Sequence, residues 1–163
     1  MIILIYGLPG TGKSFVAQQL SPELGAVHLG TDMIREKLNA KGHYDEKTKQ
    51  QVYNELFKQV MRELNQNREV IVDGVFHKAI RRDQLKKLAV ERDEPIYLIE
   101  TRADEETVKK RLRKKRKHSE ANFEVYKQLE QQFETEEDHH LELWTHNHSA
   151  EEIITAVKDF LNG

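Results

Sequence analysis

A short glycine-rich segment near the start of the chain carries the clearest chemistry. Residues 7–14 read GLPGTGKS and match the pattern GxxxxGK[ST] in full. Glycines let successive backbone N–H groups turn inward at the start of a helix, which creates a concave site for phosphate. In this pattern the lysine reaches the β- and γ-phosphate oxygens of a nucleotide, and the final hydroxyl ligates Mg²⁺. We therefore assign nucleotide binding to Gly7, Leu8, Pro9, Gly10, Thr11, Gly12, Lys13, Ser14 and Phe15.

Two residues of opposite charge, Asp32 and Arg35, have the chemistry to serve the acceptor of a phosphoryl group. They are three positions apart, so they share one face of a predicted helix. The carboxylate of Asp32 could accept or orient the proton of an attacking hydroxyl, while Arg35 could grip an anionic part of the acceptor. Alternatively, Asp32 only favours the positive end of its helix and Arg35 is a solvated surface charge.

A third carboxylate, Asp73, ends an apolar run and is followed by Gly74. We expect Asp73 to hold Mg²⁺ together with Ser14, through water or directly, or to orient the acceptor. The alternative is a structural role in capping the next turn.

A basic run covers residues 109–117. Arginines in a mobile lid can close over phosphates and stabilise the charge of the transition state. A solvated face or a nucleic-acid patch is the alternative interpretation of the same run.

Short apolar runs predict strands at residues 2–6, 26–29, 70–74 and 95–100, with a weak fifth strand at 141–144. Helical spacing predicts helices between them, at 13–20, from about 32, from near 45, at 78–92, after Asp104, at about 120–137 and after Ser149. Ser21-Pro22 is expected to end the first helix, and Thr31 to cap the second. Alternating strands and helices predict one α/β domain over residues 1–163, with ligands at the carboxyl ends of parallel strands.

The composition excludes several classes of protein. The net charge of −2 gives no overall field that would attract nucleic acid or an anionic membrane. There is no cysteine, which favours a cytoplasmic location, and no run approaches the roughly 20 apolar residues that span a bilayer. The histidines at 139, 140, 146 and 148 lack the spacing of a zinc site.

Taken in order, the motifs YGLPGTGKS, HLGTDMIREKL, VIVDGVF, ETRADEETVKKRLRKKR and SEANFEVYKQL resemble those of small P-loop kinases of the AAA-domain or zeta-toxin-like group. That group also resembles gluconate kinase, chloramphenicol phosphotransferase and polynucleotide 5′-kinase. The resemblance implies a three-layer P-loop NTPase sandwich like that of nucleoside monophosphate kinases. Its five-stranded parallel sheet would have the order 2-3-1-4-5, with a small helical lid at about residues 109–125.

The resemblance also implies residue roles. Asp32 matches the acceptor-side base, and Arg35 matches an arginine that contacts acceptor phosphate in polynucleotide kinases. Arg111 and Arg116 match lid arginines, although Arg113 is an alternative candidate for one of these two roles. Where family members often have Asp-Ala-Thr-Phe, this chain has Asp73-Gly74-Val75-Phe76, so a hydroxyl is missing.

We therefore predict a phosphotransferase that uses ATP and Mg²⁺ and phosphorylates a hydroxyl of a small metabolite or nucleotide. A nucleotide-binding regulatory module without acceptor activity is one alternative. A polynucleotide 5′-kinase is another, although the net charge and the lack of an aromatic track for bases disfavour it. The acceptor, the preference for ATP over GTP and the oligomeric state stay open.

Overall fold

One parallel sheet of five strands forms the centre of the protein. The computed structural model describes residues 1–114 and 122–163. The strands are β1 (Ile2–Tyr6), β2 (Val27–Gly30), β3 (Val70–Gly74), β4 (Ile96–Arg102) and β5 (Leu141–Trp144). All pair in parallel in the order β2-β3-β1-β4-β5, which confirms the predicted order 2-3-1-4-5.

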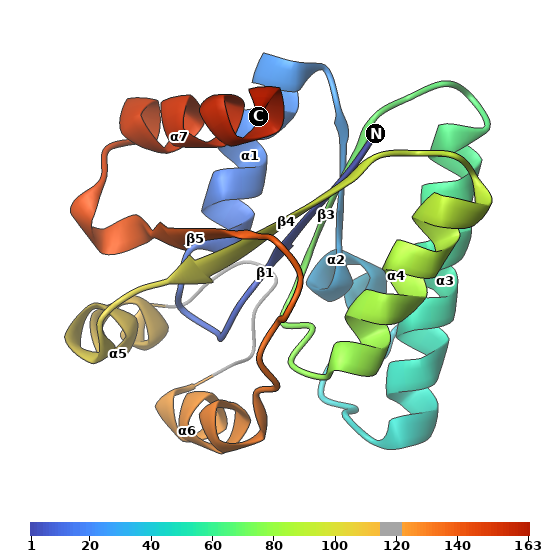
Figure 1. The fold of residues 1–163 in the computed structure, drawn as a ribbon. Coiled ribbons are helices and arrows are strands. Elements are labelled where there is room, and N and C mark those ends of the chain that lie inside the picture. The colour runs from blue at the N-terminus through green and yellow to red at the C-terminus, as the bar shows by residue number, and fades with distance from the viewer. Residues whose placement is uncertain (115–121) are drawn as a thin grey trace.

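Helices cover both faces of this sheet, as predicted for a three-layer α/β fold. Helices α1 (Lys13–Leu24) and α7 (Ala150–Asn162) lie on one face, and α2 (Thr31–Lys37), α3 (Glu46–Leu64) and α4 (Ala79–Glu91) lie on the other (Figure 1). Helices α5 (Glu105–Arg113) and α6 (Phe123–Gln132) lie apart from both layers, beyond the end of β4 (Figure 1). A short 3₁₀ turn, Thr145–Asn147, follows β5.

Strand β1 is buried on both faces, which is why its sequence is continuously apolar. Ile3 and Ile5 pack into a core with residues of α1 and α7, whereas Leu4 and Tyr6 pack into a second core with residues of α3 and α4. Because successive side chains of a strand point to opposite faces, one strand joins both cores. The loop that follows Tyr6 is therefore anchored on a rigid base.

Three local predictions are wrong. Helix α1 continues through Pro22 to Leu24 and ends at Gly25, because proline is compatible with helical φ and Leu24 packs against the α1–α7 core. Thr31 is not the cap: it is the first residue of α2, the cap position is Gly30, and the Thr31 side chain lies close to Gly74.

The third error concerns the end of α6. This helix stops at Gln132 instead of continuing to residue 137. Residues 133–140, which we call the strap, run without helix from α6 to β5. The strap is held by Arg82 of α4, whose guanidinium group binds the backbone carbonyls of Glu134 and Thr135. These tertiary hydrogen bonds replace the helical ones that the local pattern predicted.

The predicted starts of the later helices are confirmed. Asp45 accepts a hydrogen bond from the amide of Thr48, and Asp104 caps α5 in the same way. Ser149 forms a complete capping box with Glu152.

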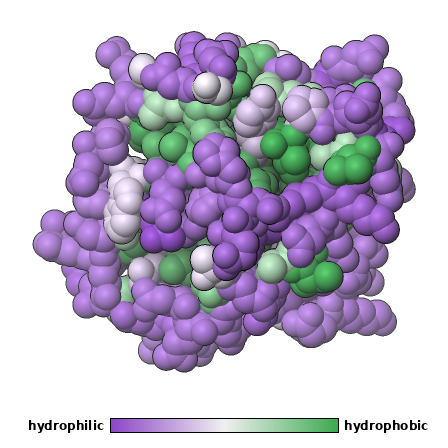
Figure 2. Space-filling view, viewed as in Figure 1, coloured by the Kyte–Doolittle hydropathy of each residue, from purple (hydrophilic) through white to green (hydrophobic). Residues whose placement is uncertain are grey.

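The molecular surface seen from the side of Figure 1 is mainly hydrophilic, with apolar residues gathered in limited patches (Figure 2). Among the helices that the structure describes, none is long and apolar enough to cross a membrane.

Candidate functional site

The glycine-rich segment forms a tight loop between β1 and α1, and α1 begins at Lys13. Gly7 has φ 149°, and a Cβ atom at this position would lie 2.5 Å from the carbonyl oxygen of Thr101 in β4. Glycine is therefore required where the loop passes its neighbouring strand. Thr11 stabilises the turn, since its hydroxyl donates to the carbonyl of Leu8 at 2.7 Å and lies 2.7 Å from the Thr101 hydroxyl. The Lys13 ammonium donates to the same Leu8 carbonyl at 3.0 Å.

The loop is also held from the side of β5 and α5. The Thr145 hydroxyl donates to the carbonyl of Thr11 at 2.7 Å. Arg111 of α5 donates from Nη1 to the Thr145 hydroxyl at 2.8 Å and to the Gly10 carbonyl at 3.2 Å. The guanidinium group of Arg111 therefore lies at the glycine-rich loop. Arg116, the second lid arginine implied by resemblance, lies outside the described residues.

Ser14 and Asp73 meet at the carboxyl end of the sheet. The Ser14 hydroxyl donates to Oδ1 of Asp73 at 3.3 Å, and Asp73 is only 5% exposed. The other carboxylate oxygen, Oδ2, contacts Nε2 of His28, which lies on β2. A hydroxyl and a carboxylate are oxygen ligands of the kind that Mg²⁺ prefers. The two side chains predicted to hold this ion thus fit it.

Asp32 and Arg35 both lie on α2, directly after β2. Asp32 is in the first turn of the helix, and the Arg35 guanidinium stacks over the ring of Tyr44 with its carbon 4.6 Å from the ring centroid. Nε and Nη1 of Arg35 are buried and have no hydrogen-bond partner among the described residues. Desolvation raises the pKa of Tyr53 to about 12, against the opposing effect of Arg81 and then of Arg35. Arg35 thus stacks on Tyr44, and Arg81 stacks on Tyr53 with its carbon 4.6 Å from the ring centroid.

The loop after β3 lies beside Tyr53 and is joined to the strap by hydrogen bonds. Phe76 has φ 45°, a conformation that is strained for a bulky residue and that is found frequently at functional sites. Arg82, which is fully buried, donates to the Phe76 carbonyl at 2.7 Å and to the Glu136 carboxylate at 2.8 Å. Its remaining bonds go to the carbonyls of Glu134 and Thr135. One side chain thus joins the loop after β3 to the strap that follows α6.

Three of these residues were missed by the sequence-based reasoning. Thr145 belongs to no motif, and His28 is the first residue of the motif HLGTDMIREKL but was given no role. Arg82 had a better signal, because it stands three residues before the buried Leu85 on the inner face of α4. A charged residue in line with an apolar face predicts a buried ionic contact.

Comparison with family models identifies one match. The model described as "AAA domain" matches residues 2–135, most of the chain. The chain belongs to this AAA domain family. The matched range contains the glycine-rich loop, Asp32, Arg35, Asp73 and Arg111. The comparison with curated proteins gave no match.

Solved structures share the fold of this AAA-domain chain at low sequence identity. The APS kinase CysC of Mycobacterium tuberculosis, in complex with AMPPNP and APS, is 18% identical with a TM-score of 0.75, over 99% of this chain and 97% of that one. A gluconokinase from Sinorhizobium meliloti 1021 is 14% identical with a TM-score of 0.72, over 98% and 94%. Chaetomium thermophilum Kti12, in complex with ADP-AlF3, is 17% identical with a TM-score of 0.74, over 98% of both chains. The fold is therefore that of the small P-loop kinase group.

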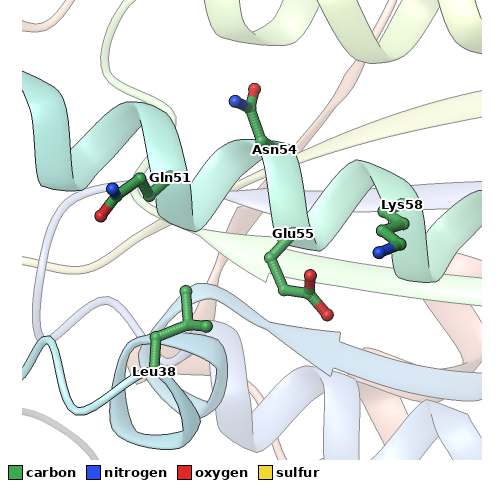
Figure 3. Close-up of a pocket in the computed structure, with 5 residues that line it drawn as sticks. All are labelled: Leu38, Gln51, Asn54, Glu55 and Lys58. Carbon is green, nitrogen blue, oxygen red and sulfur yellow. The ribbon is translucent and has the colours of Figure 1, made fainter.

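A hollow of about 420 Å³ lies between the end of α2 and α3 (Figure 3). It is lined by Leu38, Gln51, Asn54, Glu55 and Lys58. None of these residues belongs to the glycine-rich loop or to the Asp32–Arg35 region. We assign no part of the candidate site to this hollow.

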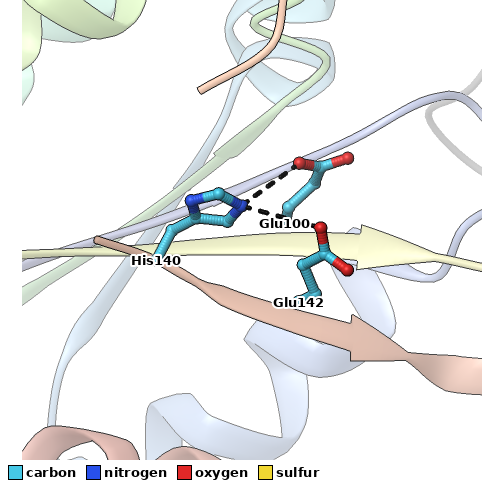
Figure 4. Close-up of side chains that lie close together, drawn as sticks. All are labelled: Glu100, His140 and Glu142. Carbon is cyan, nitrogen blue, oxygen red and sulfur yellow. Dashed lines mark ion pairs between the residues drawn. The ribbon is translucent and has the colours of Figure 1, made fainter. Parts of the chain in front are cut away.

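A second group of ligand-type side chains lies on β4, β5 and the end of the strap. Nε2 of His140 is 3.7 Å from Glu100 and 4.0 Å from Glu142 (Figure 4). Arg102, however, pairs with Glu100 at 2.9 Å and with Glu142 at 3.0 Å. Because one guanidinium group already pairs with both carboxylates, we treat this group as an ion-pair network and not as a metal centre.

Proposed function

We propose that this protein is a phosphotransferase that moves the γ-phosphoryl group of ATP to a hydroxyl group of a small molecule. The observation that carries the proposal is the position of Asp32. Strands β2 and β3 pair so that Gly30 lies opposite Asp73, and Asp73 contacts Ser14 at the start of α1. Asp32 follows Gly30 by two residues, which brings a second carboxylate to the edge of the sheet that carries the glycine-rich loop.

The glycine-rich loop and the start of α1 supply the nucleotide half of the proposed site. Lys13 would move from the Leu8 carbonyl to the β- and γ-phosphate oxygens, and Arg111 would contribute positive charge at the same loop. Ser14 and Asp73 would hold Mg²⁺, which neutralises phosphate charge. ATP as the nucleotide is supported by the complexes of two structural neighbours, one with AMPPNP and one with ADP-AlF3.

Asp32 supplies the acceptor half. In the proposed reaction the acceptor oxygen forms a bond to the γ-phosphorus, and the bond between that phosphorus and the bridging oxygen of ADP breaks. The proton of the acceptor hydroxyl passes to the Asp32 carboxylate or is oriented by it. Phe76, whose backbone is held by Arg82, provides a rigid wall at this end of the sheet.

Arg35 supports an acceptor that carries an anionic group. Its buried Nε and Nη1 have no hydrogen-bond partner among the described residues, and a buried donor without a partner is costly. A carboxylate or phosphate could accept a charge-assisted hydrogen bond from one of these donors, which lie on different edges of the guanidinium group. We therefore propose a hydroxyl compound with a negatively charged group as the substrate class.

We also propose a cytoplasmic location, which is consistent with the lack of cysteine.

The experiment that tests the function uses γ-labelled ATP, Mg²⁺ and a fractionated extract of small metabolites, followed by mass spectrometry of every compound that gains phosphate. We expect label in an anionic hydroxyl compound. A parallel reaction contains DNA and RNA oligonucleotides with 5′-hydroxyl ends, and label there would favour a polynucleotide kinase. Tight ATP binding without any labelled product would contradict the proposal and favour a regulatory nucleotide-binding module.

A further inference from the structure

The contact between His28 and Asp73 has a specific geometric origin. In the register of β2 and β3, Gly30 lies opposite Asp73 and His28 lies opposite Ile71. Side chains alternate along strands, so all four positions share one face of the sheet. That face is covered by α1, since Ile71 packs into the core of α1 and α7. His28 therefore stands diagonally across from Asp73, on the side from which Ser14 approaches.

Gly30 makes the diagonal contact possible. A Cβ atom at this position would lie 3.1 Å from Oδ2 of Asp73. A contact of that length is tighter than ordinary packing allows, so a larger residue would push the carboxylate away. With glycine, the carboxylate of Asp73 lies over the backbone of β2 and Oδ2 reaches Nε2 of His28.

The two oxygens of Asp73 consequently have different partners. Oδ1 faces the Ser14 hydroxyl, whereas Oδ2 faces the imidazole. Both side chains of the pair are shielded, with 7% of the Asp73 side chain and 15% of the His28 side chain exposed. A carboxylate in such surroundings has few water molecules to fix its orientation, so its protein partners decide where Oδ1 points.

We propose that His28 is a positioning residue for the Mg²⁺ site. An N–H donor at Nε2 holds Oδ2 and thereby directs Oδ1 to the place where Ser14 and Asp73 meet. Partners of this kind, which bind a metal ligand but not the metal, orient the ligand and raise its affinity for the ion. This inference rests on the proposed nucleotide site, but it does not depend on any acceptor.

The test measures the coupling between Mg²⁺ and nucleotide binding by calorimetry. The affinity for AMPPNP is determined with Mg²⁺ and with EDTA, and the ratio of the two affinities is the coupling. Two variants of similar side-chain length are compared: His28→Gln retains an N–H donor, and His28→Met does not. We expect His28→Met to reduce the coupling by about 10- to 100-fold, with affinity in EDTA within about twofold of wild type. His28→Gln should restore most of the coupling.

Controls separate positioning from structure. Thermal unfolding shows that each variant is folded, and His43→Met provides a histidine substitution at an exposed position of the loop before α3. Asp73→Asn, which weakens the metal ligand itself, should lose coupling at least as strongly as His28→Met.

Several outcomes would overturn the inference. One is coupling in His28→Met equal to that of wild type, and another is an equal loss of AMPPNP affinity with and without Mg²⁺. The inference would also fail if His28→Gln and His28→Met lost coupling equally, or if the wild-type protein showed no coupling. The proposed function is tested separately, by the transfer of labelled phosphate. Normal coupling without phosphoryl transfer would reject the kinase proposal and leave the role of His28 intact.

Discussion

The hydroxyl of Ser14 lies 3.3 Å from Oδ1 of Asp73, although the two residues are 59 positions apart. The contact joins the start of α1 to the end of β3, because β1 and β3 are neighbours in the sheet. It places a hydroxyl and a carboxylate beside the glycine-rich loop. The proposed binding of Mg²⁺ and nucleotide depends on this contact.

Gly7→Ala is expected to abolish tight nucleotide binding. The new Cβ would lie 2.5 Å from the Thr101 carbonyl, and φ 149° is unfavourable for alanine, so the loop must shift. Titration with AMPPNP and Mg²⁺ measures the loss. Gly25→Ala is the matched control, since Gly25 also has positive φ but a Cβ atom added there would have no atom within 4 Å. Equal affinity in Gly7→Ala and wild type would show that the loop does not bind phosphate.

Arg35→Met is expected to raise the KM for the acceptor by about tenfold to a hundredfold, because a hydrogen bond to a charged group contributes about 1.5–3 kcal/mol. The KM for ATP should stay unchanged. Steady-state kinetics with the labelled acceptor measures both constants, and Arg62→Met, at an exposed position of α3, serves as the control. An unchanged acceptor KM would place the anionic group of the substrate elsewhere.

Much of the site could be predicted from sequence because the strands are buried on both faces. Ile2–Tyr6 and residues 70–72 are continuous apolar runs, so their ends are sharply marked, and the residues that follow them fall at one edge of the sheet. The pattern GxxxxGK[ST] then identifies the loop, and parallel pairing brings Ser14 and Asp73 together. Local patterns suffice where the chemistry sits at the end of a regular element.

Tertiary contacts between polar groups could not be predicted in the same way. Ile80 and Leu85 are apolar residues at helical spacing in α4, yet Ile80 is 61% exposed and Arg82 is fully buried. The reason is a set of carbonyl and carboxylate partners on the strap, which is remote in sequence. His28 is a similar case, since its contact with Asp73 depends on strand register and on the missing side chain of Gly30.

Arg82→Met is expected to destabilise the protein by about 3–5 kcal/mol. It removes one of the two charge partners of the Glu136 carboxylate, the other being Lys86, and it leaves the carbonyls that Arg82 binds without their donor. Urea denaturation measures the free energy of unfolding. Lys87→Met, on the exposed side of α4, should change it by less than about 0.5 kcal/mol. The double variant Arg82→Met/Glu136→Gln should recover part of the loss. A single-variant effect below about 1 kcal/mol would contradict the role of Arg82 as the anchor of the strap.

The stability of the protein should fall between pH 7.5 and pH 5.5, partly because of His77. Burial lowers the pKa of His77, and the charges of Lys49 and Lys78 lower it further. The unfolded chain, with a pKa of about 6.5, therefore takes up a proton more readily than the folded protein. Stability is lost as the pH falls through this value towards the lower pKa of the folded state. His77→Gln should show a smaller difference between urea midpoints at the two pH values, while His43→Gln should match wild type.

The most direct test of the central claim compares Asp32→Asn with wild type in the same preparation. Asparagine keeps the size of the side chain but removes the carboxylate that would receive or orient the acceptor proton. We expect AMPPNP and Mg²⁺ to bind Asp32→Asn within about threefold of wild type, and transfer of labelled phosphate to fall by about 10²–10⁴-fold, the range typical of general acid–base catalysis. Equal transfer by Asp32→Asn and wild type would contradict the proposed role of Asp32 and remove the main support for a kinase.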